Sequence, residues 1–157
     1  MSVSFGIEDA LKKATLGETL AQEFDIKLGI HNHGGRHWLG NAEALRWIFA
    51  NTGSRMGLCL DTAWALDAGE DVTKLITTFK DRLHLLHLKD FTFDPARKHK
   101  DVVVGSGNIN LESLKATLEQ VGFQGLAIIE YEGDPANPVP ALKNCVKAIT
   151  SKIPFKA

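Results

Sequence analysis

Residues 28–35 read LGIHNHGG, an apolar run that stops abruptly at two histidines around an asparagine, followed by two glycines. A short, almost entirely apolar run is typical of a β-strand that is buried on both faces. The glycine pair indicates a turn directly after it. One ending of this kind fits a solvated strand end, so the interpretation depends on whether other strands end alike.

Three more apolar runs end in a similar way. Each closes on a histidine or a carboxylate, and each follows the run before it by about one strand–helix unit. The predicted strands span residues 26–31, 56–61, 83–88 and 125–130, and the polar residues at their carboxyl ends are His31, Asp61, His87 and Glu130.

Helical periodicity fills the segments around these strands. One helix followed by four strand–helix units, with nearly all-apolar strands, predicts an α/β fold on a parallel sheet. Residues 91–110 form a long polar segment that its length makes a candidate functional loop. No repeat or linker divides the chain, so residues 1–157 are predicted to form a single domain. Apolar residues recur at helical spacing over about residues 5–24, 42–51, 71–81, 111–121 and 139–152.

Composition limits the classes of partner. With 157 residues, 44% of them hydrophobic, the chain can bury a core of its own. A formal net charge of −1 argues against nucleic-acid and membrane binding, and leaves small molecules or proteins as partners. Cys59 and Cys145 lie far apart in apolar surroundings and form no disulfide pattern. Without a signal-peptide pattern or a membrane span, we expect a cytoplasmic protein.

The polar strand ends are expected to converge. In parallel α/β folds the carboxyl ends of the strands meet at one edge of the sheet, where the following loops form a crevice. Side chains alternate between the two faces of a strand, so His84 is expected on the face opposite His87, against the helices. By the same alternation, three further polar residues share a face with the strand-end set: His33, Lys89 and Glu132.

Two imidazoles and two carboxylates in one ring suit a divalent cation. His31, Asp61, His87 and Glu130 together offer the nitrogen and oxygen donors that Mn²⁺, Co²⁺, Mg²⁺ or Zn²⁺ accept. A single strand-end histidine or carboxylate usually only makes a hydrogen bond, but four strands of four point to a metal site. The GSG at 105–107 is typical of a turn, and we expect no ligand there.

Five segments in order resemble one known family. LGIHNHGG, GLCLDTAW, LHLLHLKD, VVVGSGNIN and GFQGLAIIEYE are similar to segments of the sugar phosphate isomerase/epimerase family, which has the xylose isomerase-like TIM barrel. Inosose dehydratases, ketose 3-epimerases and endonuclease IV share this barrel. The resemblance covers the second half of the barrel and implies a parallel (βα)4 half of a TIM-type barrel, preceded by one helix. It also implies a divalent metal at the barrel mouth, with His31, Asp61, His87 and Glu130 at the ligand positions.

The chain departs from that family at two residues and in length. Ketose epimerases of the family carry a glutamate at the position of His31, so their pair of catalytic carboxylates is incomplete here. Trp64 stands where related DTxH motifs have a histidine, and either stacks on a sugar or only packs. A half-barrel exposes two strand edges and an apolar inner face. We therefore expect a homodimer, a partner chain, or a longer polypeptide that supplies a missing N-terminal half-barrel.

The resemblance implies a metal-dependent isomerase or epimerase of sugars, sugar phosphates or polyols, acting by proton transfer next to a carbonyl through an enediolate. Catalytic candidates are Glu130, His33, Glu132 and Lys89, the last to neutralise an alkoxide or phosphate. Because His31 replaces a carboxylate, an inosose dehydratase-like or keto-sugar lyase activity stays open. A non-catalytic half-barrel that acts in assembly or binding is a further alternative. An endonuclease-like phosphodiesterase is disfavoured because the chain lacks a basic surface and additional ligands.

Overall fold

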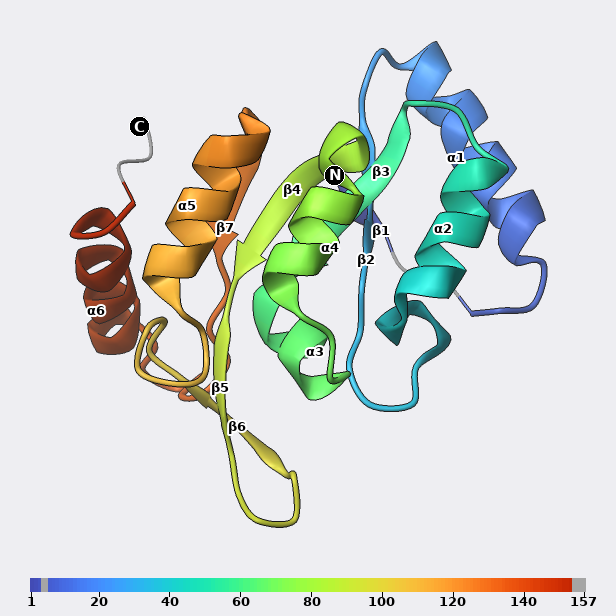
Figure 1. Ribbon diagram of the computed structural model, residues 1–157. Coiled ribbons are helices and arrows are strands. Elements are labelled where there is room, and N and C mark those ends of the chain that lie inside the picture. Colours follow the sequence, from blue (N-terminus) through green and yellow to red (C-terminus); the bar gives the residue numbers. More distant parts are fainter. Residues whose placement is uncertain (4–5, 154–157) are drawn as a thin grey trace.

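The computed structural model describes residues 1–3 and 6–153, and shows a curved parallel sheet with helices packed along it (Figure 1). Neighbouring strands of the sheet are all parallel and follow the order β1-β2-β3-β4-β7. The prediction of an α/β fold with a partial TIM-type barrel is therefore confirmed. The strands of this sheet are β1 (Ser2–Val3), β2 (Leu28–His31), β3 (Met56–Asp61), β4 (Leu83–Leu88) and β7 (Leu126–Ile129).

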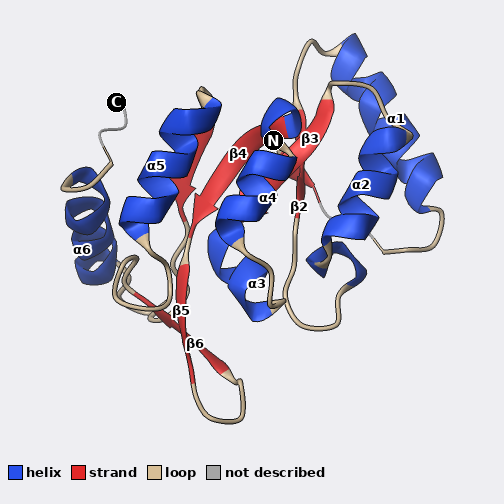
Figure 2. Ribbon diagram, in the orientation of Figure 1, coloured by secondary structure: helices blue, strands red, loops and turns tan. Residues whose placement is uncertain are grey.

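The helices follow the strands in alternation, and α3, α4 and α5 lie in front of the sheet in the view of Figure 2. Asn41, Asp71 and Asn110 begin helices by accepting hydrogen bonds from backbone N–H groups of the first turn, as capping residues do. The α-helices are α1 (Ala10–Glu23), α2 (Ala42–Ala50), α3 (Thr62–Asp67), α4 (Val72–Thr78), α5 (Leu111–Val121) and α6 (Val139–Thr150), with short 3-10 turns η1 (Trp38–Gly40) and η2 (Lys80–Arg82).

The core lies between the sheet and the helices. Ile30, Leu58 and Leu86 from three neighbouring strands are fully buried there, against Ile48 of α2 and Ile76 of α4. Burial on this side accounts for the nearly all-apolar strands, and it holds the strand ends at fixed spacing.

The opposite face of the sheet is close-packed in its middle and open at one side. Gly29 of β2 lies so near β3 that a Cβ on it would come within 2.8 Å of the Cys59 Cβ. On β7, by contrast, Leu126 and Ile128 are 68% and 47% exposed. The inner face of the barrel wall is thus apolar and uncovered at β7, as predicted for a partial barrel.

Three regions of the chain differ from the sequence prediction. The sheet has five strands rather than four, because the two residues of β1 pair with β2. Helix α3 follows β3 directly and was not predicted. The segment 91–110 is only partly a loop, because β5 (Asp90–Phe93) and β6 (His99–Val102) form an antiparallel hairpin that projects from the end of β4 (Figure 1). The predicted start of the first helix at residue 5 lies outside the described residues, and α1 begins at Ala10.

The prediction that His84 faces the helices is wrong. The pairing between β3 and β4 skips His84, which forms a bulge and interrupts the alternation of side chains. Its ring lies against Gly57, where a Cβ would come within 2.5 Å of His84 Cε1. The Nδ1 atom of His84 is 3.2 Å from the carbonyl oxygen of Leu28.

Candidate metal centre

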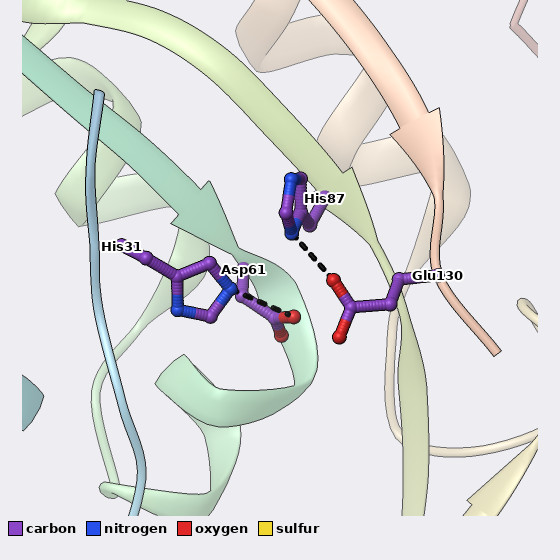
Figure 3. Close-up of side chains that lie close together, drawn as sticks. All are labelled: His31, Asp61, His87 and Glu130. Atoms are coloured by element: carbon purple, nitrogen blue, oxygen red, sulfur yellow. Dashed lines mark ion pairs between the residues drawn. The ribbon is translucent and has the colours of Figure 1, made fainter. Parts of the chain in front are cut away.

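Four side chains from four neighbouring strand ends point toward one another (Figure 3). His31 ends β2, Asp61 ends β3, His87 is next to last in β4, and Glu130 follows β7. One nitrogen or oxygen atom from each of the four lies within 4.8 Å of those from the others. The structure thus brings together all four residues that the sequence nominated as metal ligands.

Some of the nitrogen and oxygen atoms of this cluster have no hydrogen-bond partner in the part of the chain that the structure describes, although they are buried. The Asp61 side chain is fully buried, and its Oδ1 accepts a hydrogen bond of 2.9 Å from the Trp64 N–H. Its Oδ2 has no hydrogen-bond partner among the described residues, and neither does Nδ1 of His31. Buried polar atoms without partners are costly, so such a group of them fits a bound cation.

The contact distances support the same conclusion. His87 Nδ1 and Glu130 Oε2 approach to 2.6 Å, and His31 Nε2 lies 3.7 Å from Asp61 Oδ2. The donor set of two imidazoles and two carboxylates is one that Zn²⁺, Mn²⁺ or Co²⁺ binds. The residues present therefore fit a divalent metal ion.

The electrostatics of the cluster favour charge at His87 and Glu130. The Cys59 thiol and the Glu130 carboxylate raise the pKa of His87 to about 10. The hydrogen bond from His87 lowers the pKa of Glu130 to about 2. Burial would raise this pKa, and Lys89 lowers it further. In the metal-free protein the pair is an imidazolium and a carboxylate, so a metal ion would replace the proton on His87.

Asn32 joins the strand ends that carry two of the candidate ligands, and the sequence prediction gave it no role. Its side chain is buried between the ends of β2 and β3. The Asn32 Nδ2 donates to the Asp61 carbonyl oxygen at 3.0 Å, and the Asp61 N–H donates to Asn32 Oδ1 at 2.7 Å. The only signal in the sequence was its position between the two histidines of HNH.

His33 lies beside the four-residue cluster, as the alternation of side chains predicted. Its ring centroid is 5.0 Å from that of His31 and 4.4 Å from that of His37. Burial, followed by the charges of His31 and His37, lowers the pKa of His33. A neutral imidazole next to the cluster can accept a proton.

Lys89 and Glu132 also lie at the cluster, but they pair with each other. The Lys89 side chain is fully buried, and its Nζ is 3.0 Å from Glu130 Oε1 and in contact with Glu132 Oε2. Burial opposes its charge, but the hydrogen bonds to Glu132 and Glu130 outweigh burial and raise the pKa of Lys89. A third carboxylate, Asp101 of β6, lies 3.6 Å from the same Nζ and was missed because it falls in the segment predicted as a loop.

Trp64 belongs to an aromatic cluster beneath the hairpin. Its ring centroid lies 5.0 Å from Phe91 and 4.9 Å from His99, at interplanar angles of 85° and 86°. Its Cε3 lies so close to Gly34 that a Cβ there would come within 2.6 Å. Of the two roles considered for Trp64, these contacts favour packing.

The hairpin is held against α3 and the GSG loop. His99 Nδ1 lies 3.0 Å from Asp67 Oδ1, which ties β6 to the end of α3. At the start of β5, the Asp90 carboxylate accepts four hydrogen bonds of 2.8 to 3.1 Å from backbone N–H groups of residues 105–109. The glycines of the GSG therefore approach a carboxylate of the same chain.

Comparison with known proteins gives a family. A family profile described as "Xylose isomerase-like TIM barrel" matches residues 7–150. The chain is 27% identical over 134 residues to an inosose dehydratase of Lacticaseibacillus casei, an alignment that takes in 76% of this chain and 45% of that protein. The chain thus spans less than half the length of this relative.

Solved structures share the fold. A "D-tagatose 3-epimerase-like protein" superposes with a TM-score of 0.73 at 17% identity, covering 96% of this chain and 63% of that one. An "IOLI protein with a binding zinc atom" gives a TM-score of 0.75 at 16% identity, covering 94% of this chain and 59% of that one. Among the described residues, no helix is both long and apolar enough to cross a membrane.

Proposed function

Because this chain belongs to the xylose isomerase-like TIM barrel family, we propose that it takes part in a divalent-metal-dependent isomerisation or epimerisation of a sugar, sugar phosphate or polyol. The observation that carries the proposal is the convergence of four ligand atoms within 4.8 Å at the carboxyl ends of parallel strands. One of these ligands, Asp61, is fully buried with an oxygen that has no partner among the described residues. In TIM barrels, catalytic groups gather at the carboxyl ends of the strands, which form the mouth of the barrel.

The proposed metal ligands are His31, Asp61, His87 and Glu130. When bound, the ion would supply Lewis-acid polarisation of the substrate carbonyl. Zinc is a reasonable candidate from the donor set, and Mn²⁺, Co²⁺ and Mg²⁺ are alternatives. The zinc atom named for the IOLI protein supports zinc as the first ion to test.

Among the candidate bases, His33 is favoured. Glu130 is engaged by His87 and Lys89, and Glu132 contacts the Lys89 ammonium. His33 stands next to the cluster, and its lowered pKa keeps the imidazole neutral at pH 7. A neutral base within reach of the carbon next to the carbonyl is what proton abstraction requires.

A dehydratase or keto-sugar lyase is the second candidate. The inosose dehydratase of Lacticaseibacillus casei is similar over 76% of the chain, and His31 stands where epimerases of the family have a carboxylate. Both reactions begin with removal of a proton next to a carbonyl. They differ in whether that proton returns or a hydroxyl group leaves.

The apolar surface at both ends of the sheet supports a partner that completes the barrel. Exposed apolar side chains occur on and directly after α1 at one end and on β7 and α6 at the other, including Leu16, Phe24, Leu126 and Val146. A TIM barrel has eight strands, and this sheet has five. Two copies would supply ten, so the count favours three further strand–helix units over a homodimer. These units would come from a partner chain or from a longer polypeptide.

Metal analysis and isotope exchange test the proposal. Protein purified without chelator should contain about one divalent ion per chain. Incubation of the metal-loaded protein in D₂O with ketoses and inososes should place deuterium next to the carbonyl of the substrate. Release of water with formation of an unsaturated ketone would select the dehydratase. Metal binding without exchange or elimination across the panel would favour the remaining alternative, a non-catalytic subunit.

A further inference from the structure

Lys89 lies between β4 and β5 with a charged group that is completely enclosed. Its side chain has no exposed surface, and its Nζ lies within 4.0 Å of three carboxylates, those of Glu130, Glu132 and Asp101. The rings of Trp64 and Phe91 lie 5.8 and 5.9 Å from the same atom. A buried ammonium is tolerated only with such partners, because its desolvation is costly.

These contacts leave Lys89 little opportunity to meet a substrate. The carboxylates and the two rings lie around Nζ, and the side chain has no exposed surface. The expectation that Lys89 neutralises a substrate alkoxide or phosphate is therefore replaced by a different role.

We propose that Lys89 is a positioning residue that orients Glu130 for metal binding. Lys89 Nζ holds Glu130 Oε1 at 3.0 Å, which turns the other oxygen, Oε2, toward His87 Nδ1. Glu130 follows the last residue of β7 and its side chain is 30% exposed, so without Lys89 its carboxylate would be held, among the described residues, by His87 alone. The inference rests on the proposed function, because it takes Glu130 to be a metal ligand.

Lys89 also ties the hairpin to the metal cluster. Asp101, on β6, lies 3.6 Å from Lys89 Nζ, and its Oδ2 accepts a hydrogen bond of 3.1 Å from the Glu132 N–H. One ammonium thus joins the end of β7, the residue pair Glu130 and Glu132 after it, and the hairpin. Outer partners that orient metal ligands commonly change metal affinity by about 10- to 100-fold when they are removed.

Cobalt titration of Lys89→Met tests the proposal. Methionine keeps the unbranched side chain as far as the position of Cε and removes the ammonium group. The dissociation constant for Co²⁺, followed by visible absorption, should rise by about 10- to 100-fold. The matched control is Lys100→Met, which removes an exposed lysine from the same hairpin and should leave the constant within about twofold of wild type.

A double-mutant cycle asks whether Lys89 acts through Glu130. In a Glu130→Gln background the further loss from Lys89→Met should be small, because the carboxylate that it orients is already gone. Equal losses in both backgrounds, or an unchanged constant in the single variant, would overturn the proposal. If wild-type protein binds no Co²⁺, the proposed function itself fails, so the two failures are distinguishable.

A measurement on wild-type protein covers the case in which Lys89→Met does not fold. Lys89 is the one fully buried lysine among the described residues, so its ammonium protons should exchange slowly enough to give a ¹H–¹⁵N signal. Zn²⁺ should shift this signal, since it would bind the carboxylate that Lys89 contacts. A signal that does not change on saturation with Zn²⁺ would contradict the proposal.

Discussion

Asn32 and Asp61 exchange two hydrogen bonds across neighbouring strand ends, of 3.0 and 2.7 Å, and both residues are buried. The pair joins the ends of β2 and β3 at the point where each strand presents a proposed metal ligand. The asparagine between His31 and His33 therefore has a structural role, and the HNH motif combines a proposed metal ligand, a residue that joins two strand ends, and a proposed base.

Asn32→Ala should destabilise the protein and weaken metal binding. The substitution leaves the N–H and carbonyl groups of Asp61 buried without partners, which should cost about 2–4 kcal/mol. Urea denaturation of the metal-free protein measures this loss, and Co²⁺ titration measures the effect on the site. Asn144→Ala, an exposed position on α6, should change stability by less than about 0.5 kcal/mol. Equal stability of the two variants would refute the role of Asn32.

Asp61→Asn should abolish metal binding while the fold persists. The amide can still accept the hydrogen bond from the Trp64 N–H that begins α3, but it replaces the charged oxygen that faces His31. Asp71→Asn is the control, because Asp71 begins α4 in the same way and lies outside the cluster. Metal content by mass spectrometry should fall to near zero only in the first variant. A full complement of metal in Asp61→Asn would contradict the proposed site.

His33→Gln should remove proton transfer without removing the metal. Loss of a general base typically slows the reaction by about 10²- to 10⁴-fold. The readout is deuterium incorporation into whichever substrate the wild-type protein exchanges. His37→Asn should retain most of this activity, because an asparagine side chain can still accept the Leu39 N–H that His37 binds. Unimpaired exchange by His33→Gln would exclude His33 and leave Glu132 as the base to test.

Gly34→Ala should strain the turn after β2. A methyl group there would come within 2.3 Å of Asp67 Oδ2 and 2.6 Å of Trp64 Cε3, so side chains on α3 must move. The expected loss of stability is about 1–3 kcal/mol. Gly6→Ala adds a methyl group with nothing within 4 Å and serves as the control in thermal unfolding.

The stability of the metal-free protein should fall on both sides of neutral pH. Glu130, with its pKa lowered to about 2 by His87, stabilises the fold above its ordinary value of 4.5 and loses this effect as the pH falls toward 2. His87, with its pKa raised to about 10 by Cys59 and Glu130, stabilises the fold below 6.5 and loses this effect as the pH rises toward 10.

Urea denaturation of chelator-treated protein between pH 3 and pH 10 measures both limbs. Glu130→Gln removes the carboxylate, so it should flatten the acid limb and reduce the alkaline limb, which Cys59 also supports. A profile of the variant that parallels wild type would show that other groups control the pH dependence.

The sequence predicted the parts of the fold that have strong local signals. Four strands carry apolar runs, and the polar residues at their carboxyl ends are the four that converge in the structure, His31, Asp61, His87 and Glu130. The two residues of β1 are too few to show a pattern, and they form a strand only because β2 pairs with them.

Other features depend on tertiary contacts that no periodicity records. The hairpin contains charged residues in its second strand, HKDV, and its order comes from pairing with β5 and from the contacts of Asp101 and His99. The bulge at His84 shifts one side chain to the unexpected face. Asn32 forms its bonds with a residue 29 positions away, so its role was invisible along the chain.

Four backbone N–H groups of residues 105–109 donate hydrogen bonds to the Asp90 carboxylate. Loops that bind anions arrange their N–H groups in this way, but here the anion belongs to the same chain. A tethered carboxylate is present at a high effective concentration whatever the surrounding solution contains. The loop before α5 therefore needs no phosphate or other solute to become ordered, and free anions would have to displace a group that cannot diffuse away. The end of the barrel mouth nearest α5 is thus shaped by folding alone, independently of substrate supply and salt.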